Sequence, residues 1–258
     1  MTLLYLKLVV TPLLMWAVSL ASRRWGGLLG GLLSGLPITS ALVMTFLCLE
    51  QGNGFALGAV PGALGGLAAV QATYTCYLYA TRRLGIAGAA LLSLMFYAVA
   101  GYAFTHWGSP YLSVAVALLL IVVLIRATGR EPGPDALATP RHRYWEIPLR
   151  MVAATTLLMV TTSLASWLGP AASGILAPIP VIAWPLVVFA QLQNGRPGMA
   201  MMIRGNAIGA VGVIAFYLTV AGVLESTGIA LTIPLAVALA VALTVALATL
   251  LRKRRAAH

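Results

Sequence analysis

The sequence predicts an all-α membrane protein with about nine transmembrane helices in two inverted repeats, five helices in the first and four in the second. Three observations lead to this fold class: an apolar composition, a series of apolar segments of membrane-spanning length, and two halves that resemble each other. Hydrophobic residues make up 61% of the 258 residues and charged residues 8%, whereas about a quarter of the residues of soluble proteins are charged. We therefore expect the lipid bilayer to be the main partner of the chain.

The net charge of +11 does not indicate a nucleic-acid partner, because the basic residues form short clusters between apolar segments. Membrane topology produces this distribution. Cys48 and Cys76 both lie in apolar segments, and His106, His142 and His258 have no carboxylate or Cys at ligand spacing. Neither a disulfide framework nor a metal site is predicted.

Segments of about 17 to 25 mostly apolar residues, separated by polar or turn-forming breaks, are candidate spans. We place them at 3–22, 28–49, 55–80, 84–105, 110–126, 147–167, 172–192, 198–224 and 228–251. Residues 127–146 contain several prolines and arginines and are expected to form a cytoplasmic linker. This linker separates a first membrane repeat, 1–126, from a second repeat with a basic cytoplasmic tail, 147–258.

The distribution of Lys and Arg predicts the orientation, because cytoplasmic loops retain them. Basic residues fall in every second connection, and of the 16 Lys and Arg residues Lys7 alone lies on the other side. The amino terminus is therefore expected outside the cell and the carboxyl terminus in the cytoplasm.

The two halves match at a nearly constant offset. A shift of 144 residues aligns "LLM" and "SLAS" at 13–15 and 19–22 with the same letters at 157–159 and 163–166. At a shift of 143 the matches continue with Gly31/Gly174, Leu33/Leu176, Pro37/Pro180, Phe46/Phe189, Gly52/Gly195, Gly62/Gly205, Gly66/Gly209, Ala72/Ala215 and Tyr74/Tyr217. We interpret this offset as a tandem duplication. Because the first copy has an odd number of spans, the second copy is expected to enter the bilayer from the opposite face, as in many secondary transporters.

Proline interrupts the second and seventh spans at matched positions, in "SGLPITS" (34–40) and "APIPVIA" (177–183). Proline removes a backbone hydrogen bond, so carbonyls at 31–33 and 174–176 need other partners. Hydroxyls at 34, 39 and 40 can serve the first break, and Ser173 is the nearest hydroxyl at the second. Two interpretations remain open: broken helices that meet at a binding site, or kinked helices that allow close packing.

Candidate substrate-binding residues lie at the two breaks and on polar or aromatic positions of the third and eighth spans. They are Ser34, Pro37, Thr39, Ser40, Gln71, Tyr74, Pro178, Pro180 and Tyr217. Helix-to-helix hydrogen bonds explain the Gln71 and tyrosine positions equally well. Glycines at four-residue spacing on spans 2, 3 and 8 predict that spans 2, 3, 7 and 8 form a closely packed centre.

Ion or proton sites are predicted at polar residues near the ends of spans, because such residues are rare in membranes. The candidates are Glu50, Gln193 and Arg204. Glu50 can instead be a solvated carboxylate at the outer surface. Arg204 can instead extend its side chain to the cytoplasmic interface.

The segments 34–52 and 173–195 resemble the GlpM-like group of small bacterial inner-membrane proteins of about four spans. The resemblance covers spans 1–4 and 6–9, and implies a fused duplicate of that unit in the bacterial inner membrane. It also implies a link to exopolysaccharide production, and it supplies no ligand residues. The additional fifth span departs from the group and is the element that inverts the second copy.

These features predict a small carrier or flippase-type transporter that works by alternating access on a small-molecule, ion or lipid substrate. The alternative is a non-transporting membrane component that supports an envelope or exopolysaccharide biosynthesis complex. The sequence has no nucleotide-binding loop, catalytic serine context or pair of intramembrane acids placed for hydrolysis, so neither an enzyme nor a cofactor is expected. A homodimer is left open.

Overall fold

The computed structural model describes residues 5–14, 16–17, 20, 32–107, 109–129, 146–179 and 183–256. These residues form helices joined by short turns, and no strand occurs among them. The helices are α2 (Ile38–Gln51), α3 (Asn53–Ala80), α4 (Ile86–Trp107), α5 (Pro110–Thr128), α6 (Glu146–Ser163), α7 (Ala165–Leu176) and α8 (Ala183–Ala256). A shorter apolar helix, Tyr5–Leu14, precedes them. Most of the predicted linker, residues 130–145, lies outside the described residues.

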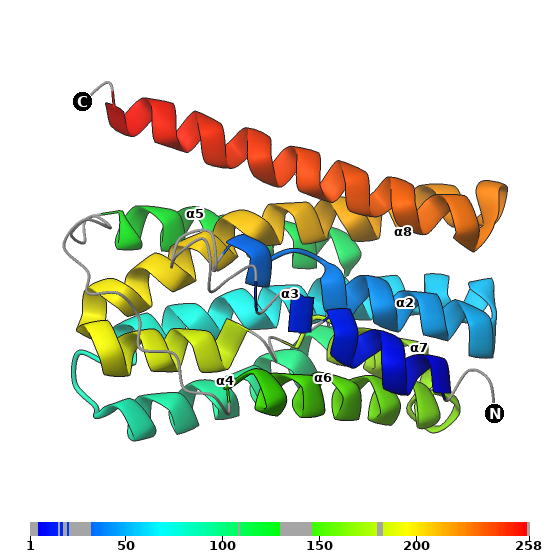
Figure 1. Ribbon diagram of the computed structural model, residues 1–258, viewed down its shortest axis with the longest axis horizontal. Helices are drawn as coiled ribbons and strands as arrows, with labels where there is room; N and C mark the ends of the chain where they lie inside the picture. Colours follow the sequence, from blue (N-terminus) through cyan, green and yellow to red (C-terminus); the bar gives the residue numbers. More distant parts are fainter. Residues whose placement is uncertain are drawn as a thin grey trace.

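Helix α8 is not one straight helix, because its 74 residues include Gly195 with φ 62° and Gly228 with φ 69°. Glycine adopts positive φ without the strain that a Cβ would cause, so it permits an abrupt change of direction. Figure 1 shows the three parts of α8, coloured from yellow through orange to red, folding back on one another. Gly52, between α2 and α3, also has a positive φ of 88°.

Five described segments are long and apolar enough to cross a membrane: Leu32–Gln51, Asn53–Ala80, Ile86–Phe104, Pro110–Thr128 and Ala183–Lys253. They support the prediction of a membrane-embedded protein. Helices α3, α4 and α5 lie within a few residues of the predicted third, fourth and fifth spans. The predicted span 172–192 is instead divided between α7 and the start of α8.

Helix α3 lies at the centre of the bundle and contacts α2, α4, α5, α7 and α8. Its contact with α7 is the closest, because a Cβ on Gly62 would clash with the Ala171 carbonyl and one on Gly174 with the Ala59 carbonyl. This agrees with the predicted packing of spans 3 and 7. The predicted centre omitted α5, which packs against both α3 and α8.

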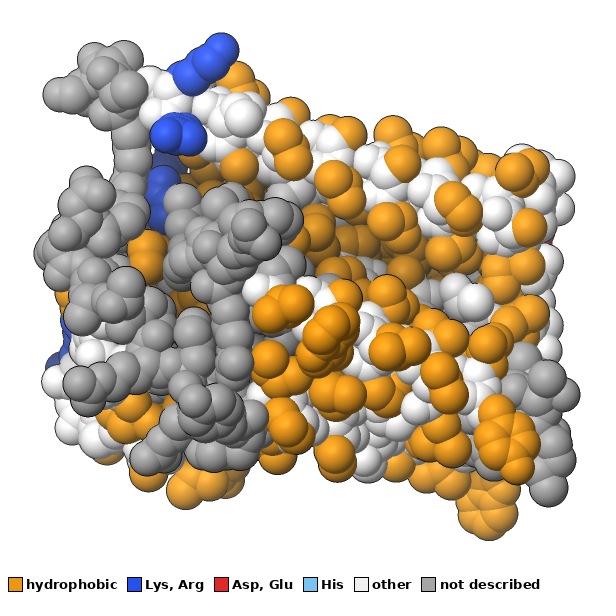
Figure 2. Space-filling model, in the orientation of Figure 1, with side chains coloured by type: hydrophobic (Ala, Val, Ile, Leu, Met, Phe, Trp, Pro, Cys, Tyr) orange, Lys and Arg blue, Asp and Glu red, His pale blue; other side chains and the backbone are white. Residues whose placement is uncertain are grey.

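Apolar side chains cover much of the described surface on the face that Figure 2 shows. On α4, Leu91, Met95 and Val99 are each at least 65% exposed. Large exposed apolar surfaces are typical of contact with lipid or with other proteins. The Lys and Arg side chains visible in Figure 2 gather at the end where α8 terminates.

Candidate functional site

The first helix break lies at residues 35–37, immediately before α2. There the backbone tightens, because Gly35 N donates to Leu32 O at 3.1 Å and Leu36 N donates to Leu33 O at 3.3 Å. Such shorter turns satisfy carbonyls that an α-helix would otherwise leave free. The carbonyls at 32 and 33, expected to lose their partners, therefore keep hydrogen bonds.

The second break follows α7, where Ala177 N donates to Gly174 O at 3.1 Å. The Ile175 carbonyl accepts a hydrogen bond from Tyr97 Oη of α4 at 2.9 Å. Tyr97 was not predicted from the sequence, in which Ser173 is the nearest hydroxyl at this break. Ser173 Oγ is buried without a hydrogen-bond partner among the described residues, and Pro180 lies outside them. No sequence signal distinguished Tyr97 from the other tyrosines, because its role depends on how α4 packs.

Each break packs against a glycine of the other half of the chain. A Cβ on Gly66 of α3 would lie 2.6 Å from Ile175 O and 2.8 Å from the Pro178 ring. A Cβ on Gly209 of α8 would lie 2.9 Å from Leu32 O and 2.8 Å from Gly35 Cα. The 143-residue shift pairs the glycines with each other, and also the residues they contact: Gly66/Gly209, Leu32/Ile175 and Gly35/Pro178.

A cavity of about 30 Å³ lies between the two breaks, with room for roughly two water molecules. It is lined by Ser34, Gly35, Leu36, Thr39, Ser40, Leu67, Val70, Gln71, Pro178, Ile179, Asn206, Ala210 and Val213. The same shift relates several of these residues to one another: Gly35/Pro178, Leu36/Ile179, Leu67/Ala210 and Val70/Val213.

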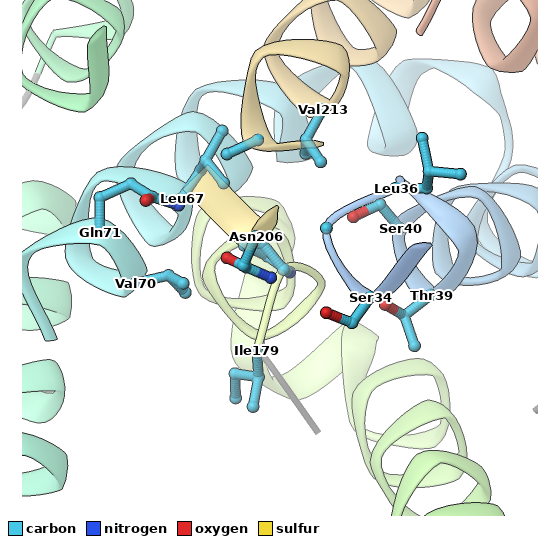
Figure 3. A pocket seen from close by; sticks show the side chains of 13 residues that line it. Ser34, Leu36, Thr39, Ser40, Leu67, Val70, Gln71, Ile179, Asn206 and Val213 are labelled. Atoms are coloured by element: carbon cyan, nitrogen blue, oxygen red, sulfur yellow. The ribbon is translucent and has the colours of Figure 1, made fainter. Parts of the chain in front are cut away.

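The polar groups of the cavity come from three parts of the chain. Figure 3 shows Ser34, Thr39 and Ser40 on one side, Gln71 of α3 on the opposite side, and Asn206 of α8 between them. Gln71 is 0% exposed, and neither its amide nitrogen nor its oxygen has a hydrogen-bond partner among the described residues. A buried polar group without a partner is rare in folded proteins, so it often marks a place for water or a ligand.

The amino-terminal end of α2 lies at the same cavity, with Thr39 and Ser40 in its lining. Pro37, at the N-cap, makes no side-chain capping hydrogen bond. The backbone hydrogen bonds that close the first turn begin with Ala41 N, which donates to Pro37 O at 2.7 Å. The N–H groups of Thr39 and Ser40 therefore have no backbone acceptor among the described residues.

The cavity thus brings together five of the nine predicted substrate-binding residues: Ser34, Thr39, Ser40, Gln71 and Pro178. It does not include the other three candidates that the structure describes. Pro37 caps α2, while Tyr74 and Tyr217 are fully buried and line no part of it. Tyr74 instead packs against Trp184, with ring centroids 5.9 Å apart. Asn206, an amide that is only 5% exposed, lines the cavity but was not among the residues predicted from the sequence.

Glu50 forms an ion pair outside the cavity. Its carboxylate lies 2.6 Å from Lys7 Nζ, and the exposed fractions of the two side chains are 22% and 4%. Lys7 also donates to Thr162 Oγ1 of α6 at 2.6 Å. Glu50 therefore has a counter-charge in Lys7, which neither the proton or cation site nor the solvated carboxylate predicted from the sequence included.

The other two ion candidates also lie away from the cavity. Arg204 is 9% exposed and donates through Nη1 to Ile125 O at 3.0 Å. A cation at the carboxyl end of a helix, here α5, is stabilised by the helix dipole. Gln193 is exposed on α8. Across the described ranges, no group of three or more His, Cys, Asp and Glu residues could hold a metal ion.

Comparison of the chain with protein-family models, with curated proteins and with solved structures finds no match. The resemblance to the GlpM-like group therefore stays an expectation. The indications of function come from the geometry of the breaks and of the cavity between them.

Proposed function

We propose that the chain is a small membrane carrier that works by alternating access, with nine spans in two inverted repeats. The observation that carries this proposal is a cavity lined by matched residues of both halves, at two matched helix breaks. Transporters built from inverted repeats bind their substrates near the membrane midplane, at discontinuous helices from each repeat.

The positions of two matched turns support the inversion. Gly52 precedes α3, whose 28 residues span about 42 Å. Gly195 precedes Arg196, whose Nη1 donates to Thr81 Oγ1, just after the other end of α3, at 3.4 Å. The two turns thus lie at opposite ends of α3, the arrangement that inverted copies require.

Two polar contacts join the halves at opposite ends of α3. They are candidates for the two gates of the carrier. At one end Lys7 of the first half donates to Thr162 of the second, and at the other Arg196 of the second half donates to Thr81 of the first. Separation of the halves at either end has to break the contact there. We assign the end rich in Lys and Arg to the cytoplasm of a bacterial inner membrane.

Accessibility of one cavity residue tests alternating access without knowledge of the substrate. Thr39→Cys is placed in a chain whose Cys48 and Cys76 are replaced by Ala, and is treated with a membrane-impermeant maleimide on either side of sealed vesicles. Alternating access predicts labelling from both sides. Ser93→Cys, at a position that is 0% exposed on α4, is the control and is expected to stay unlabelled from either side. Labelling of Thr39→Cys from one side only would favour the non-transporting envelope component.

A further inference from the structure

We propose that the cavity between the two helix breaks binds a small monovalent anion. The inference deepens the proposed carrier function by naming the class of its substrate. It depends on the hydrogen-bond character of the cavity lining, on the lack of charged side chains in that lining, and on the size of the cavity.

The lining offers hydrogen-bond donors. Thr39 and Ser40 lie in the first turn of α2, where their N–H groups have no backbone acceptor among the described residues. The amino-terminal end of a helix carries a partial positive charge and binds anions readily. Gln71 and Asn206 add side-chain amide groups on the other sides of the cavity.

Gln71 is the independent indication that a ligand is missing. Its side chain points from α3 towards the centre of the cavity in Figure 3, and both of its polar atoms are buried without a partner among the described residues. Inside a membrane such a group is costly unless it meets another polar group. An anion in the cavity would accept a hydrogen bond from Gln71 Nε2.

A metal cation fits the lining less well. Among the described residues no carboxylate lines the cavity, and the ion pair of Glu50 with Lys7 is outside it. Several carbonyls at the breaks already accept hydrogen bonds, those of Leu32 and Leu33 from the backbone and that of Ile175 from Tyr97. These three carbonyls are therefore engaged, and the buried side-chain acceptor that stays without a partner among the described lining residues is the neutral amide oxygen of Gln71.

The size and charge of the cavity favour a small, singly charged anion. Its volume of about 30 Å³ corresponds to roughly two water molecules, the size of a halide or of formate. No cationic side chain of the described part of the chain lines it, and Arg204 donates instead to the carboxyl end of α5. Neutral donors and one helix end suit a single negative charge better than two.

The test is thermal unfolding of the purified full-length protein in detergent, at constant ionic strength, with sodium formate or sodium chloride exchanged for sodium gluconate. A ligand that binds the folded state raises Tm with a dependence on its concentration. We expect formate or chloride to give a saturable rise in Tm that is unchanged when sodium is replaced by potassium. A rise that follows the cation, or one that is equal in all salts, would overturn the anion site.

Gln71→Leu is the decisive variant, because removing a buried polar group that has no partner should not lower basal stability. The variant is expected to fold with an equal or higher Tm in gluconate and to bind formate at least tenfold more weakly. Gln51→Leu, at the exposed end of α2, is the matched control and should keep the response. If Gln71→Leu fails to fold, Asn206→Leu, which removes the other side-chain amide of the cavity lining, is used in its place. An unaltered anion response in the cavity variant contradicts the proposal.

The anion site and the carrier function can fail separately. A formate-dependent rise in Tm without labelling of Thr39→Cys from both sides of the membrane supports the anion site and removes the carrier. Labelling from both sides without any anion response keeps the carrier and removes the anion site.

Discussion

Lys7 is the one basic residue that departs from the alternating distribution of Lys and Arg in the sequence. Its contacts in the structure explain how a charge is accommodated there. Its ammonium group, on a residue that is 3% exposed, lies 2.6 Å from Glu50 Oε1 and 5.4 Å from the centre of the Phe46 ring. A buried cation needs such partners, because desolvation of an isolated charge is expensive. The sequence suggested that Glu50 was unusual but could not provide its partner, which is 43 residues away.

Glu50→Gln is expected to lower the free energy of unfolding by about 3 kcal/mol, because it leaves a buried ammonium group without its counter-charge. Lys7→Met should cost less, since the Glu50 carboxylate left behind is 22% exposed. Unfolding in mixed detergent micelles measures both changes. Glu225→Gln, at an exposed position, serves as the control. A double variant that is less stable than Glu50→Gln alone would contradict this account of the pair.

Tyr97→Phe tests the hydroxyl that satisfies the second helix break. The substitution removes the donor to Ile175 O and is expected to lower the free energy of unfolding by about 1 to 3 kcal/mol, the cost of leaving a buried acceptor unsatisfied. Tyr102→Phe on the same helix, at a position that is 61% exposed, should have little effect. Equal losses in the two variants, measured in the same micelles, would show that the Tyr97 hydroxyl has no specific role.

At the scale of the helices, apolar length predicted α3, α4 and α5 within a few residues, because each is a single uninterrupted segment. The seventh span was predicted less well. Its first half is α7 and its second half begins α8 at Ala183, so the break that the prolines indicated divides it into separate elements. The sequence therefore located the break, but the packing around it, including Tyr97 and Asn206, depends on contacts between distant segments.

Gly209→Ala tests whether close helix contact at the first break is required. A Cβ at Gly209 would lie 2.8 Å from the Gly35 carbonyl carbon and Cα, and backbone atoms cannot move aside as a flexible side chain would. Overpacking of this kind typically costs about 1 to 3 kcal/mol. Gly222→Ala on the same helix has nothing within 4 Å of its Cβ, so it should be neutral or stabilising, since alanine is the better helix former. The measurement is the free energy of unfolding of each variant. Equal values for Gly209→Ala and Gly222→Ala would contradict the predicted clash.

At the scale of the whole molecule, the proposed repeat relates glycines and helix breaks of the two halves. The sequence offset alone could not show where these residues lie in space. The offset of 143 residues pairs Gly66 with Gly209, and each of these glycines packs against the helix break of the other half. The sequence could predict that the breaks correspond. It could not predict that each break would pack against the other half of the chain, because these contacts depend on how α3, α7 and α8 cross.

The same offset matches Arg83 with Ser226, and both residues are exposed. Together they test the inversion of the two halves directly. Figure 1 places the turn after α3 at one end of the molecule and the turn between the orange and red parts of α8 at the other. In a chain without Cys48 and Cys76, Arg83→Cys should react with a membrane-impermeant maleimide only from the cytoplasmic side, and Ser226→Cys only from the outside. Inverted copies place equivalent residues on opposite faces of the bilayer. Reaction of both residues from the same side would mean that the two halves are parallel, and the carrier proposed here would lose the symmetry on which its alternating access depends.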